Sequence, residues 1–324
     1  MKNSEFKSRV FLAPMAGITD KPMRRLVSEF GPGNIVSEMA AVNAIQWRNP
    51  KTYRLIDVRD EPYPVIVQLV GGKPDLFADA VKMAEDLGAA SIDINMGCPV
   101  KKIINNQSGS YLMKDMKLAS QIIKTAIKNT KLNISVKFRA GWDKLHINAV
   151  EFAKMCEDCG ASYITVHGRT RSDFYSGQAD WDIIKQVKQN VTIPVIGNGD
   201  IVTPQQSKER IEQTGVDGVM IARGVLGSPW IIAQTHNYLE FGTQPQQFAI
   251  SEVKQILLKH LQYLIEYYGE NMALQISRKY VCWYSKGLRD AKKFRETYMH
   301  ITNYQQAYQA IYQYFDECAL QESE

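Results

Sequence analysis

One cysteine in the sequence stands in a setting that suits proton transfer. Cys98 lies between Gly97 and Pro99, so the backbone is free to turn on one side and is stiffened on the other. Asn95 lies just upstream, at the end of a predicted strand. A thiol has a pKa of about 8.5, close enough to neutrality for proton donation. Most unpaired cysteines are buried and structural, but this loop position favours chemistry, and we predict that Cys98 is a catalytic proton donor.

Two further polar side chains stand in predicted strands. Lys137 is flanked by Val136 and Phe138. A solvated lysine is the ordinary alternative, but the alternation predicts that Lys137 points inward, where it needs an anionic partner. His167 ends another predicted strand, and by itself it is weak evidence, because a satisfied structural histidine is common. Together with Cys98 and Asn95, these residues indicate a polar pocket with an anionic occupant.

The elements that must position these residues alternate in type along the chain. Eight β-branched or apolar runs recur over roughly the first 240 residues, most of them followed by amphipathic stretches of helical length. The predicted strands are Val10–Ala13, Ile35–Ser37, Val65–Leu69, Ser91–Asn95, Ile134–Phe138, Tyr163–His167, Val195–Gly197 and Gly218–Ile221, and predicted helices include Pro74–Leu87, Asn148–Cys159 and Pro204–Gln213. This alternation predicts an α/β fold, a (β/α)8 TIM barrel of the usual length, about 250 residues. A doubly wound sheet is disfavoured because no GxGxxG follows the first strand.

Useful side chains gather at the carboxyl ends of these strands, where barrel enzymes build their active sites. The strand ends carry Ala13-Pro14-Met15-Ala16-Gly17, Ser37-Glu38, Gln68, Asn95, Lys137 with Arg139, His167, Gly197-Asn198-Gly199-Asp200 and Ala222-Arg223-Gly224. Loops after strands seven and eight often bind phosphate, and Arg223 is suited to pair with it. There is no dinucleotide fingerprint and no lysine in an obvious Schiff-base context, so flavin mononucleotide (FMN) is the cofactor that fits best.

The character of the sequence changes after a Gly/Pro/Gln-rich linker at Phe241–Gln247. From Ser251 onward helical patterns rich in Tyr, Leu, Ile and Lys replace the strand-like runs. We therefore predict a catalytic barrel over residues 1–243 and a helical bundle over residues 244–324.

The excess positive charge of the chain lies in this helical region. The net charge is +5, and the segment Ile276–His300 alone has seven basic and two acidic residues, so the rest of the chain is balanced. The basic residues are Arg278, Lys279, Lys286, Arg289, Lys292, Lys293 and Arg295. If Ile276–Arg295 formed one helix, uninterrupted at Gly287, most of them would share one face. A solvated charged face is the ordinary alternative, but Trp283 and Tyr284 between the cations favour RNA binding.

Composition excludes several classes of protein. At 45% hydrophobic and 23% charged residues the chain is typical of a soluble globular protein, and no stretch approaches the ~20 apolar residues of a membrane span. The short polar N-terminus predicts no signal peptide. Five scattered cysteines predict reduced thiols in a cytoplasmic protein. Cys156 and Cys159 form a CxxC without a second pair, so we expect no metal site.

Six motifs in this order resemble the tRNA-dihydrouridine synthases, most closely the bacterial B-type subgroup, over nearly the whole chain. They are Ala13-Pro14-Met15-Ala16-Gly17, Asn95-Met96-Gly97-Cys98-Pro99, Val136-Lys137-Phe138-Arg139, His167-Gly168-Arg169-Thr170-Arg171, Gly197-Asn198-Gly199-Asp200 and Ala222-Arg223-Gly224. One departure is Gly109-Ser110-Tyr111-Leu112-Met113, where a stretch of smaller residues is expected and Tyr111 is bulky.

The resemblance implies an FMN barrel, reduced by NADPH, that transfers a hydride to C6 of a tRNA uracil while Cys98 protonates C5. It implies that Pro14, Met15 and Ala16 line the flavin ring, that Gln68 and Lys137 hydrogen-bond it with His167 beside it, and that Asn198, Gly199, Asp200, Ala222 and Arg223 hold the ribityl chain and phosphate. Asn95 is implied to position the uracil, and we also assign Arg139 to substrate binding. Lys101 and Lys102 are either solvated loop charges or contacts to an RNA phosphate.

Two other functions stay open from the sequence. An FMN barrel acting on a free pyrimidine or another small molecule, similar to dihydroorotate dehydrogenase, shares much of this site but needs no basic helical region. A non-catalytic RNA-binding protein does not need Cys98, Asn95, Lys137 and His167 together. We expect tRNA and NADPH as partners, no DNA, no membrane, and a monomer.

Overall fold

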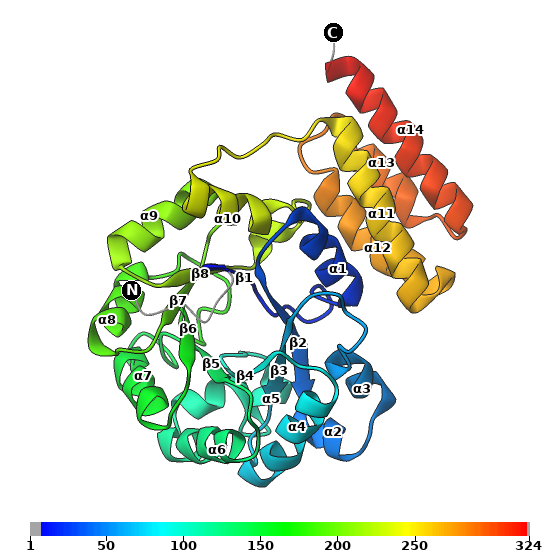
Figure 1. Ribbon diagram of the computed structural model, residues 1–324. Helices are drawn as coiled ribbons and strands as arrows, with labels where there is room; N and C mark the ends of the chain where they lie inside the picture. Colours follow the sequence, from blue (N-terminus) through cyan, green and yellow to red (C-terminus); the bar gives the residue numbers. More distant parts are fainter. Residues whose placement is uncertain (1–7, 323–324) are drawn as a thin grey trace.

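The strands of this computed structural model, which describes residues 8–322, close into a barrel. All eight are parallel, and each pairs with its neighbours in sequence order while β8 returns to β1 (Figure 1). They are β1 (Val10–Leu12), β2 (Asn34–Ala41), β3 (Val65–Val70), β4 (Ser91–Met96), β5 (Ile134–Arg139), β6 (Tyr163–His167), β7 (Val195–Asn198) and β8 (Gly218–Ile221). The predicted fold class is confirmed. Residues 1–7, part of the polar segment that predicts no signal peptide, lie outside the described residues.

Helices surround the barrel and carry the chain from each strand to the next. They are α1 (Lys21–Phe30), α2 (Val42–Gln46), α3 (Pro50–Ile56), α4 (Pro74–Asp86), α5 (Lys101–Ile104), α6 (Met116–Lys128), α7 (Ala149–Asp158), α8 (Trp181–Asn190), α9 (Pro204–Thr214) and α10 (Ile231–Phe241), with 3-10 turns η1 (Gly109–Met113) and η2 (Arg223–Val225). Local chemistry sets their starts: Asp20 caps α1, and Thr203 caps α9 ahead of Pro204.

The second strand is longer than predicted, which changes the place of two polar residues. Ser37 and Glu38 were expected at its end, but β2 runs on to Ala41 with a shift of register between Val36 and Met39. Such a bulge re-aims side chains. Ser37 Oγ accepts the Gln68 backbone N–H, and Glu38 accepts the N–H of Gly17 in the loop after β1.

Side chains fill the barrel interior, so the site can lie only at one end. The inner cluster comprises Phe11, Ala13, Val36, Ile66, Tyr163, Ile196 and Met220, and the Phe11 and Tyr163 rings are 5.8 Å apart. A second, larger apolar layer lies between the strands and the outer helices. This close packing is typical of TIM barrels and holds the strand ends rigidly.

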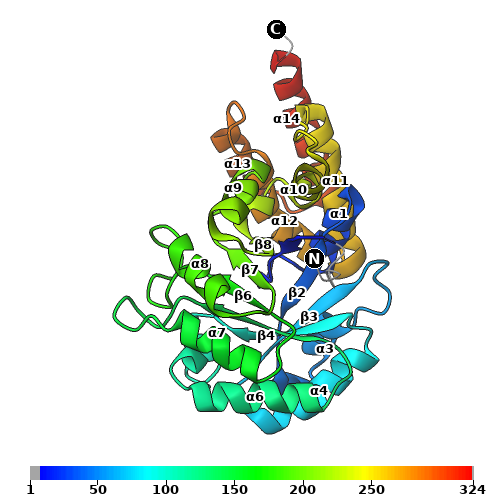
Figure 2. The same ribbon diagram turned by 60° about the vertical axis from the view of Figure 1, so that its left-hand side comes forward.

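Four helices form a separate group beside α1 and α10 (Figures 1 and 2). They are α11 (Ile250–Tyr268), α12 (Glu270–Tyr284), α13 (Ala291–Met299) and α14 (Tyr304–Glu322). Helix α11 packs on α12, α14 and α1. Residues 242–249, before α11, have no regular structure. Within residues 8–322, no helix combines the length and apolar character that crossing a membrane requires.

The basic segment does not form one continuous helix, and the interruption considered at Gly287 is present. Helix α12 ends at Tyr284, α13 begins at Ala291, and between them Gly287 has a φ of +87°, a left-handed conformation that interrupts helices. The seven cations are therefore divided between two helices and a turn. Tyr284, which we expected to be available for base stacking, is buried among the helices. The expectation for Tyr284 is wrong because tertiary packing, not periodicity, decides which side of α12 faces water.

Candidate active site

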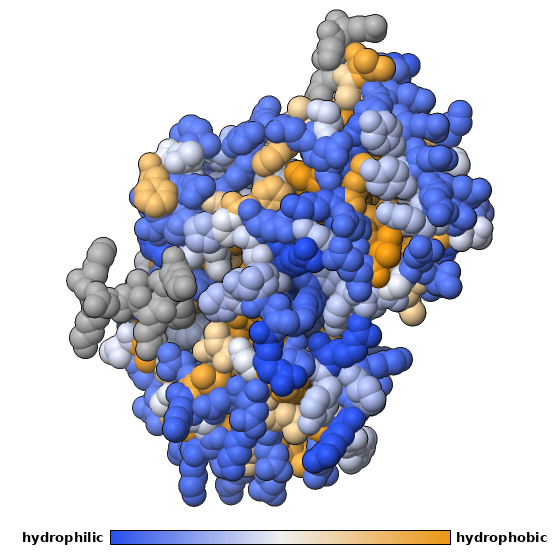
Figure 3. Space-filling view, turned by 45° about the vertical axis from the view of Figure 1, so that its right-hand side comes forward, coloured by the Kyte–Doolittle hydropathy of each residue, from blue (hydrophilic) through white to orange (hydrophobic). Residues whose placement is uncertain are grey.

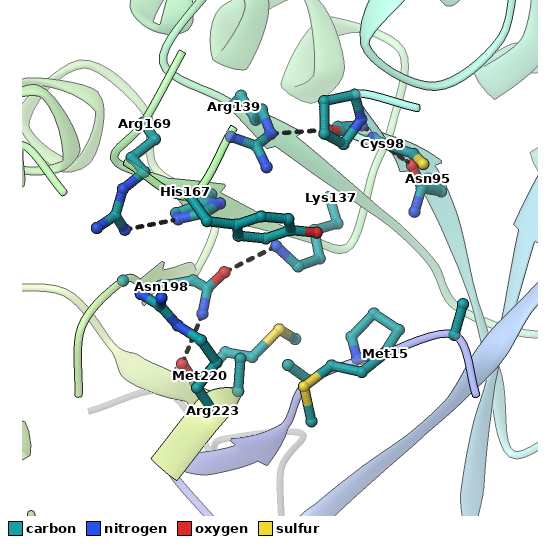
Figure 4. Close-up of a pocket in the computed structure, with 18 of the residues that line it drawn as sticks. Met15, Asn95, Cys98, Lys137, Arg139, His167, Arg169, Asn198, Met220 and Arg223 are labelled. Atoms are coloured by element: carbon teal, nitrogen blue, oxygen red, sulfur yellow. Dashed lines mark hydrogen bonds between the residues drawn. The ribbon is translucent and has the colours of Figure 1, made fainter. Parts of the chain in front are cut away.

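A cavity of about 580 Å³ opens at the carboxyl ends of the strands. Its volume lies within the range of roughly 300–1,000 Å³ typical of ligand sites. Among its lining residues are all those predicted to hold a cofactor: Pro14, Met15, Ala16, Gln68, Lys137, His167, Asn198, Gly199, Asp200, Ala222 and Arg223. Asn95, Cys98 and Arg139 line it too. In the close-up, Cys98 and Asn95 lie at one side and Arg223 at the other, with Lys137 between them (Figure 4).

The Cys98 turn is held by the side chain of Asn95. Asn95 Oδ1 accepts the backbone N–H groups of Gly97 at 3.1 Å and Cys98 at 2.9 Å. The Cys98 carbonyl in turn accepts the Ser110 backbone N–H at 3.1 Å and its hydroxyl at 3.0 Å. Burial raises the pKa of the Cys98 thiol. The thiol is therefore protonated at neutral pH and can act as a proton donor.

A chain of hydrogen bonds behind Asn95 fixes the direction of its amide. Asn95 Nδ2 donates to Gln68 Oε1 at 2.9 Å, and Gln68 Nε2 donates to Asp93 Oδ2 at 2.7 Å. Ser135 Oγ donates to the other carboxylate oxygen at 2.6 Å. Burial raises the pKa of Asp93, whereas the hydrogen bonds from Ser135 and Gln68 and the charge of Lys137 lower it. As a carboxylate Asp93 only accepts hydrogen bonds, so in that state it sets the amide of Gln68, which sets the amide of Asn95. Sequence reasoning missed Asp93, although its spacing of two from Asn95 puts both on one face of β4.

Lys137 faces the cavity and has one close polar partner among the contacts described. Its Nζ donates to Asn198 Oδ1 at 2.9 Å, and Asn198 Nδ2 donates to the Met220 carbonyl at 2.8 Å. Burial and, to a lesser extent, the nearby Arg139 lower the pKa of Lys137 to about 8 against the opposing effect of Asp93. A partly buried ammonium with so little compensation would be stabilised by an anionic or carbonyl-rich ligand.

His167 is neutral. Burial lowers its pKa well below 6.5, and the cations Lys137, Arg139, Arg169 and Arg223 lower it further. The Arg169 guanidinium approaches His167 Nε2 at 3.4 Å. A neutral imidazole beside a cavity can donate or accept one hydrogen bond without adding charge.

Two arginines and one carboxylate form the end of the cavity at β7 and β8. Asp200 accepts hydrogen bonds from Arg169 at 2.9 Å and from Arg223 at 2.8 Å. Burial alone would raise the pKa of Asp200, but the Ala179 N–H, Arg169 and Arg223 together lower it. Arg169 is buried, whereas Arg223 is half-exposed. Because a carboxylate repels phosphate, Asp200 suits the role of holding Arg223 in place better than that of touching a phosphate itself.

Arg139 makes more hydrogen bonds within the protein than we expect of a residue whose role is to bind substrate. It is buried and donates to the carbonyls of Gly97 at 2.8 Å, Thr170 at 2.9 Å and Phe174 at 2.9 Å. Its guanidinium carbon lies 5.7 Å from the ring centre of Tyr175, which is largely exposed and lines the cavity. Sequence reasoning missed Tyr175 because it lies in a loop with no periodic pattern.

The cations predicted to bind RNA do not line the cavity. Lys101 and Lys102 are exposed on α5, next to the cavity residue Val100. In the helical region Lys286, Arg289, Lys292 and Lys293 are exposed, whereas Arg278, Lys279 and Arg295 are partly buried and donate to Ile301, Gly17 and Ser285. Hydrophilic side chains cover most of this region in the space-filling view (Figure 3). Four of the seven are thus exposed, although Arg289 also pairs with Asp290 and Lys292 with Glu296.

The family model described as dihydrouridine synthase matches residues 11–323. The chain belongs to the dihydrouridine synthase family. It is 45% identical over 90% of its length to a probable tRNA-dihydrouridine synthase of Rickettsia conorii, of which 89% is covered. It is 42% identical to tRNA-dihydrouridine synthase B of Vibrio vulnificus, with 98% of both chains covered. Membership confirms the resemblance seen in the sequence and the predicted enzyme class, a flavin-dependent oxidoreductase.

Solved structures with low sequence identity share the barrel. Histamine dehydrogenase from Rhizobium sp. 4-9 has a TM-score of 0.55 at 13% identity, over 79% of this chain and 49% of that one. A variant of NCR from Zymomonas mobilis has a TM-score of 0.52 at 14% identity, over 76% and 90% of the two chains. At such identities these similarities concern the fold alone.

Proposed function

We propose that this protein is an FMN- and NADPH-dependent tRNA-dihydrouridine synthase that reduces the C5=C6 bond of a uridine in tRNA. The observation that carries the proposal is the position of Cys98. In a member of this family, a partly buried and protonated thiol lines the same cavity as every residue predicted to hold the flavin.

The cavity suits an anionic flavin with a phosphate. Ala13, Met15, Met220 and Ala222 give it an apolar wall suited to a flat ring. Lys137 and neutral His167 supply polar contacts within it. Arg223, held by Asp200 at the β7–β8 end, would pair with the phosphate while Gly199 permits close approach of the backbone. When bound and reduced by NADPH, FMN would supply the hydride that reaches C6 of the uracil.

The chain's own residues would complete the reduction. Hydride addition at C6 leaves an electron pair at C5 that must be protonated. The Sγ–H of Cys98 supplies this proton, the C5–H bond forms, and the resulting thiolate regains a proton from solvent. Asn95 holds the Cys98 turn through Oδ1. One N–H of its amide donates to Gln68, and the amide nitrogen makes only a long contact with Met39 Sδ at 3.8 Å, which a uracil carbonyl would replace.

The uridine must leave the stacked RNA to reach this cavity. Unpaired loop uridines in tRNA are the easiest to extrude, which helps to select them. Lys286, Arg289, Lys292 and Lys293, together with Lys101 and Lys102, would hold the phosphate backbone. We expect the protein to act as a monomer in the cytoplasm. We also propose that residues 1–243 form the catalytic barrel and residues 244–324 the RNA-binding region.

The test compares the wild type with Cys98→Ala, using visible spectra and mass spectrometry of dihydrouridine formed from NADPH and dihydrouridine-deficient tRNA. We expect both proteins to be yellow. The variant should lose product formation by a factor of roughly 10²–10⁴, the usual effect of a positioned general acid. A yellow wild type that oxidises NADPH but leaves tRNA unchanged would instead indicate a small-molecule flavin enzyme. A wild type that binds no flavin would rule out the proposed chemistry.

A further inference from the structure

One helix of the C-terminal region forms part of the support of the cavity wall. From α12, Lys279 Nζ donates to the carbonyl of Gly17, and the hydroxyl of Tyr280 donates to the carbonyl of Ile18 at 3.1 Å. Ile18 lines the cavity, as do Met15 and Ala16 just before Gly17. The loop predicted to lie against the flavin ring is therefore held by the region predicted to bind RNA.

This loop is held from several sides. Gly17 has a φ of +71°, so its turn needs the left-handed conformation that glycine adopts most easily. Its N–H is bound by Glu38 of β2 and its carbonyl by Lys279 of α12. Tyr268, at the end of α11, donates to Asp20 Oδ2 at 3.0 Å. Removing Lys279 would leave the Gly17 carbonyl without its contact from the helical region.

The electrostatic setting of Lys279 explains why it stays in this partly buried place. Burial lowers the pKa of its ammonium, whereas Asp20 and Glu38 raise it. The two carboxylates thus compensate for part of the desolvation of the cation. Lys279 therefore acts as an internal tie between the two regions and is not free to be the phosphate contact that the sequence predicts.

The same helix also meets the loop on the other side of the cavity. Gly227, with a φ of +78°, follows Leu226, which lines the cavity together with Arg223. A Cβ on Gly227 would lie 2.7 Å from the carbonyl oxygen of Trp283, near the end of α12. Helix α12 is thus in direct contact with the loops after β1 and β8, which would hold the flavin ring and its phosphate.

We propose that α12, through Lys279, is a positioning element of the cofactor site, and that flavin and tRNA consequently bind this chain cooperatively. This inference rests on the proposed function. Lys286 and Arg289 follow α12 directly, so RNA held there would restrain the helix that holds both loops. A flavin that orders those loops reduces the conformational entropy that is lost when RNA binds. Flavin should therefore strengthen RNA binding, and RNA should strengthen flavin binding by the same free energy.

The first test measures FMN affinity by flavin fluorescence for Lys279→Met. Loss of the tie should weaken FMN binding about tenfold, within the range of coupling effects between sites. Lys279→Arg keeps a donor and should recover most of the affinity. The matched control is Lys259→Met, which removes an ion pair between α11 and Glu29 of α1 without touching either loop. The control should stay within about twofold of the wild type, the size of a surface ion pair.

The second test compares tRNA affinity with and without FMN. Wild type and Lys259→Met should bind tRNA about fivefold more tightly when FMN is present, whereas this ratio should approach one in Lys279→Met. Wild-type FMN affinity in Lys279→Met, or an unchanged ratio, would overturn the proposal.

Hydrogen exchange of the protein without cofactor separates this proposal from the proposed function. Faster exchange at residues 15–20 in Lys279→Met, but not in Lys259→Met, would support the tie even if the enzyme acted on another substrate. Equal protection in both variants would contradict the tie even if the wild type made dihydrouridine.

Discussion

The barrel and the helical region use positive charge in opposite ways. In the barrel, Arg139 and Arg169 are buried and Lys137 is partly buried, and all three are directed at fixed carbonyl, amide or carboxylate partners. In the helical region, Lys286, Lys292 and Lys293 are exposed. Buried cations shift the pKa values of neighbouring groups and hold their hydrogen-bond partners in place. Exposed cations attract polyanions over longer distances, and salt screens this attraction. A cluster of cations in a sequence therefore indicates a function only once the structure shows which of them are buried and which are exposed.

After the loss of the Cys98 thiol itself, the largest effect should come from the buried chain of hydrogen bonds that positions Cys98. Asp93→Asn removes the charge that forces Gln68 to present its N–H to residue 93, so that the amides of Gln68 and Asn95 can reverse. Misplacing a catalytic acid lowers the reaction rate up to about 10²-fold. We therefore expect kcat to fall roughly 10–100-fold while KM for tRNA changes little. Steady-state kinetics on dihydrouridine formation measures this.

Ser135→Ala is the matched control for the Asp93 variant. It removes the other hydrogen bond to the same carboxylate but leaves the acceptor that orients Gln68. We expect its kcat to stay within about threefold of the wild type, equivalent to the loss of a single hydrogen bond of ~0.6 kcal/mol. Equal losses in the two variants would show that Asp93 acts through general stability and not through amide direction.

A smaller effect should follow from removing an exposed cation. Lys293→Ala takes away a proposed phosphate contact on α13, so KM for tRNA should rise a few-fold with kcat unchanged, and the salt dependence of binding should weaken by about one unit of slope. Arg295→Ala is the contrasting variant, because Arg295 donates to Ser285 at 2.9 Å. It should lower the melting temperature more than it weakens tRNA binding. If Arg295→Ala weakened tRNA binding more than it lowered the melting temperature, the distinction between exposed cations and cations bonded within the protein would be wrong.

The smallest effect concerns the reactivity of Cys98. Its pKa is raised by burial, so the reactive thiolate is scarcer at a given pH than for an exposed cysteine. Alkylation by iodoacetamide, followed by mass spectrometry of the Cys98 peptide, should be slow at pH 7 and rise with pH beyond 9. Fast labelling at neutral pH would mean a thiolate at rest, which cannot donate the proton.

Much of the barrel and its site follows from local pattern. Alternation along β5 predicts an inward Lys137, and the strand ends converge because parallel strands finish on one face of a closed barrel. The Gly-Cys-Pro turn predicts a loop for Cys98. The role of Asp93 does not follow, because it depends on contacts with Gln68 of β3 and Ser135 of β5, far apart in sequence.

The helical region was harder to predict from its sequence. Periodicity would place most of the cations on one face only if the segment were a single helix, but Gly287 adopts a left-handed conformation and the chain turns there. Lys279 and Lys286 belong to the same charged segment, yet one contacts Gly17 and the other is exposed. The packing of α12 against a distant loop decides which of these two lysines is held inside the protein. The local sequence does not contain that information.

The sequence by itself determined the barrel, the gathering of polar residues at its carboxyl end and the family. Strand alternation and short motifs are local properties, and the geometry of a closed parallel barrel converts them into position. Only the tertiary structure decided which cations are exposed, how Asp93 directs the Cys98 turn and that α12 supports the cavity. These depend on burial and on contacts between residues up to 262 positions apart, such as Gly17 and Lys279.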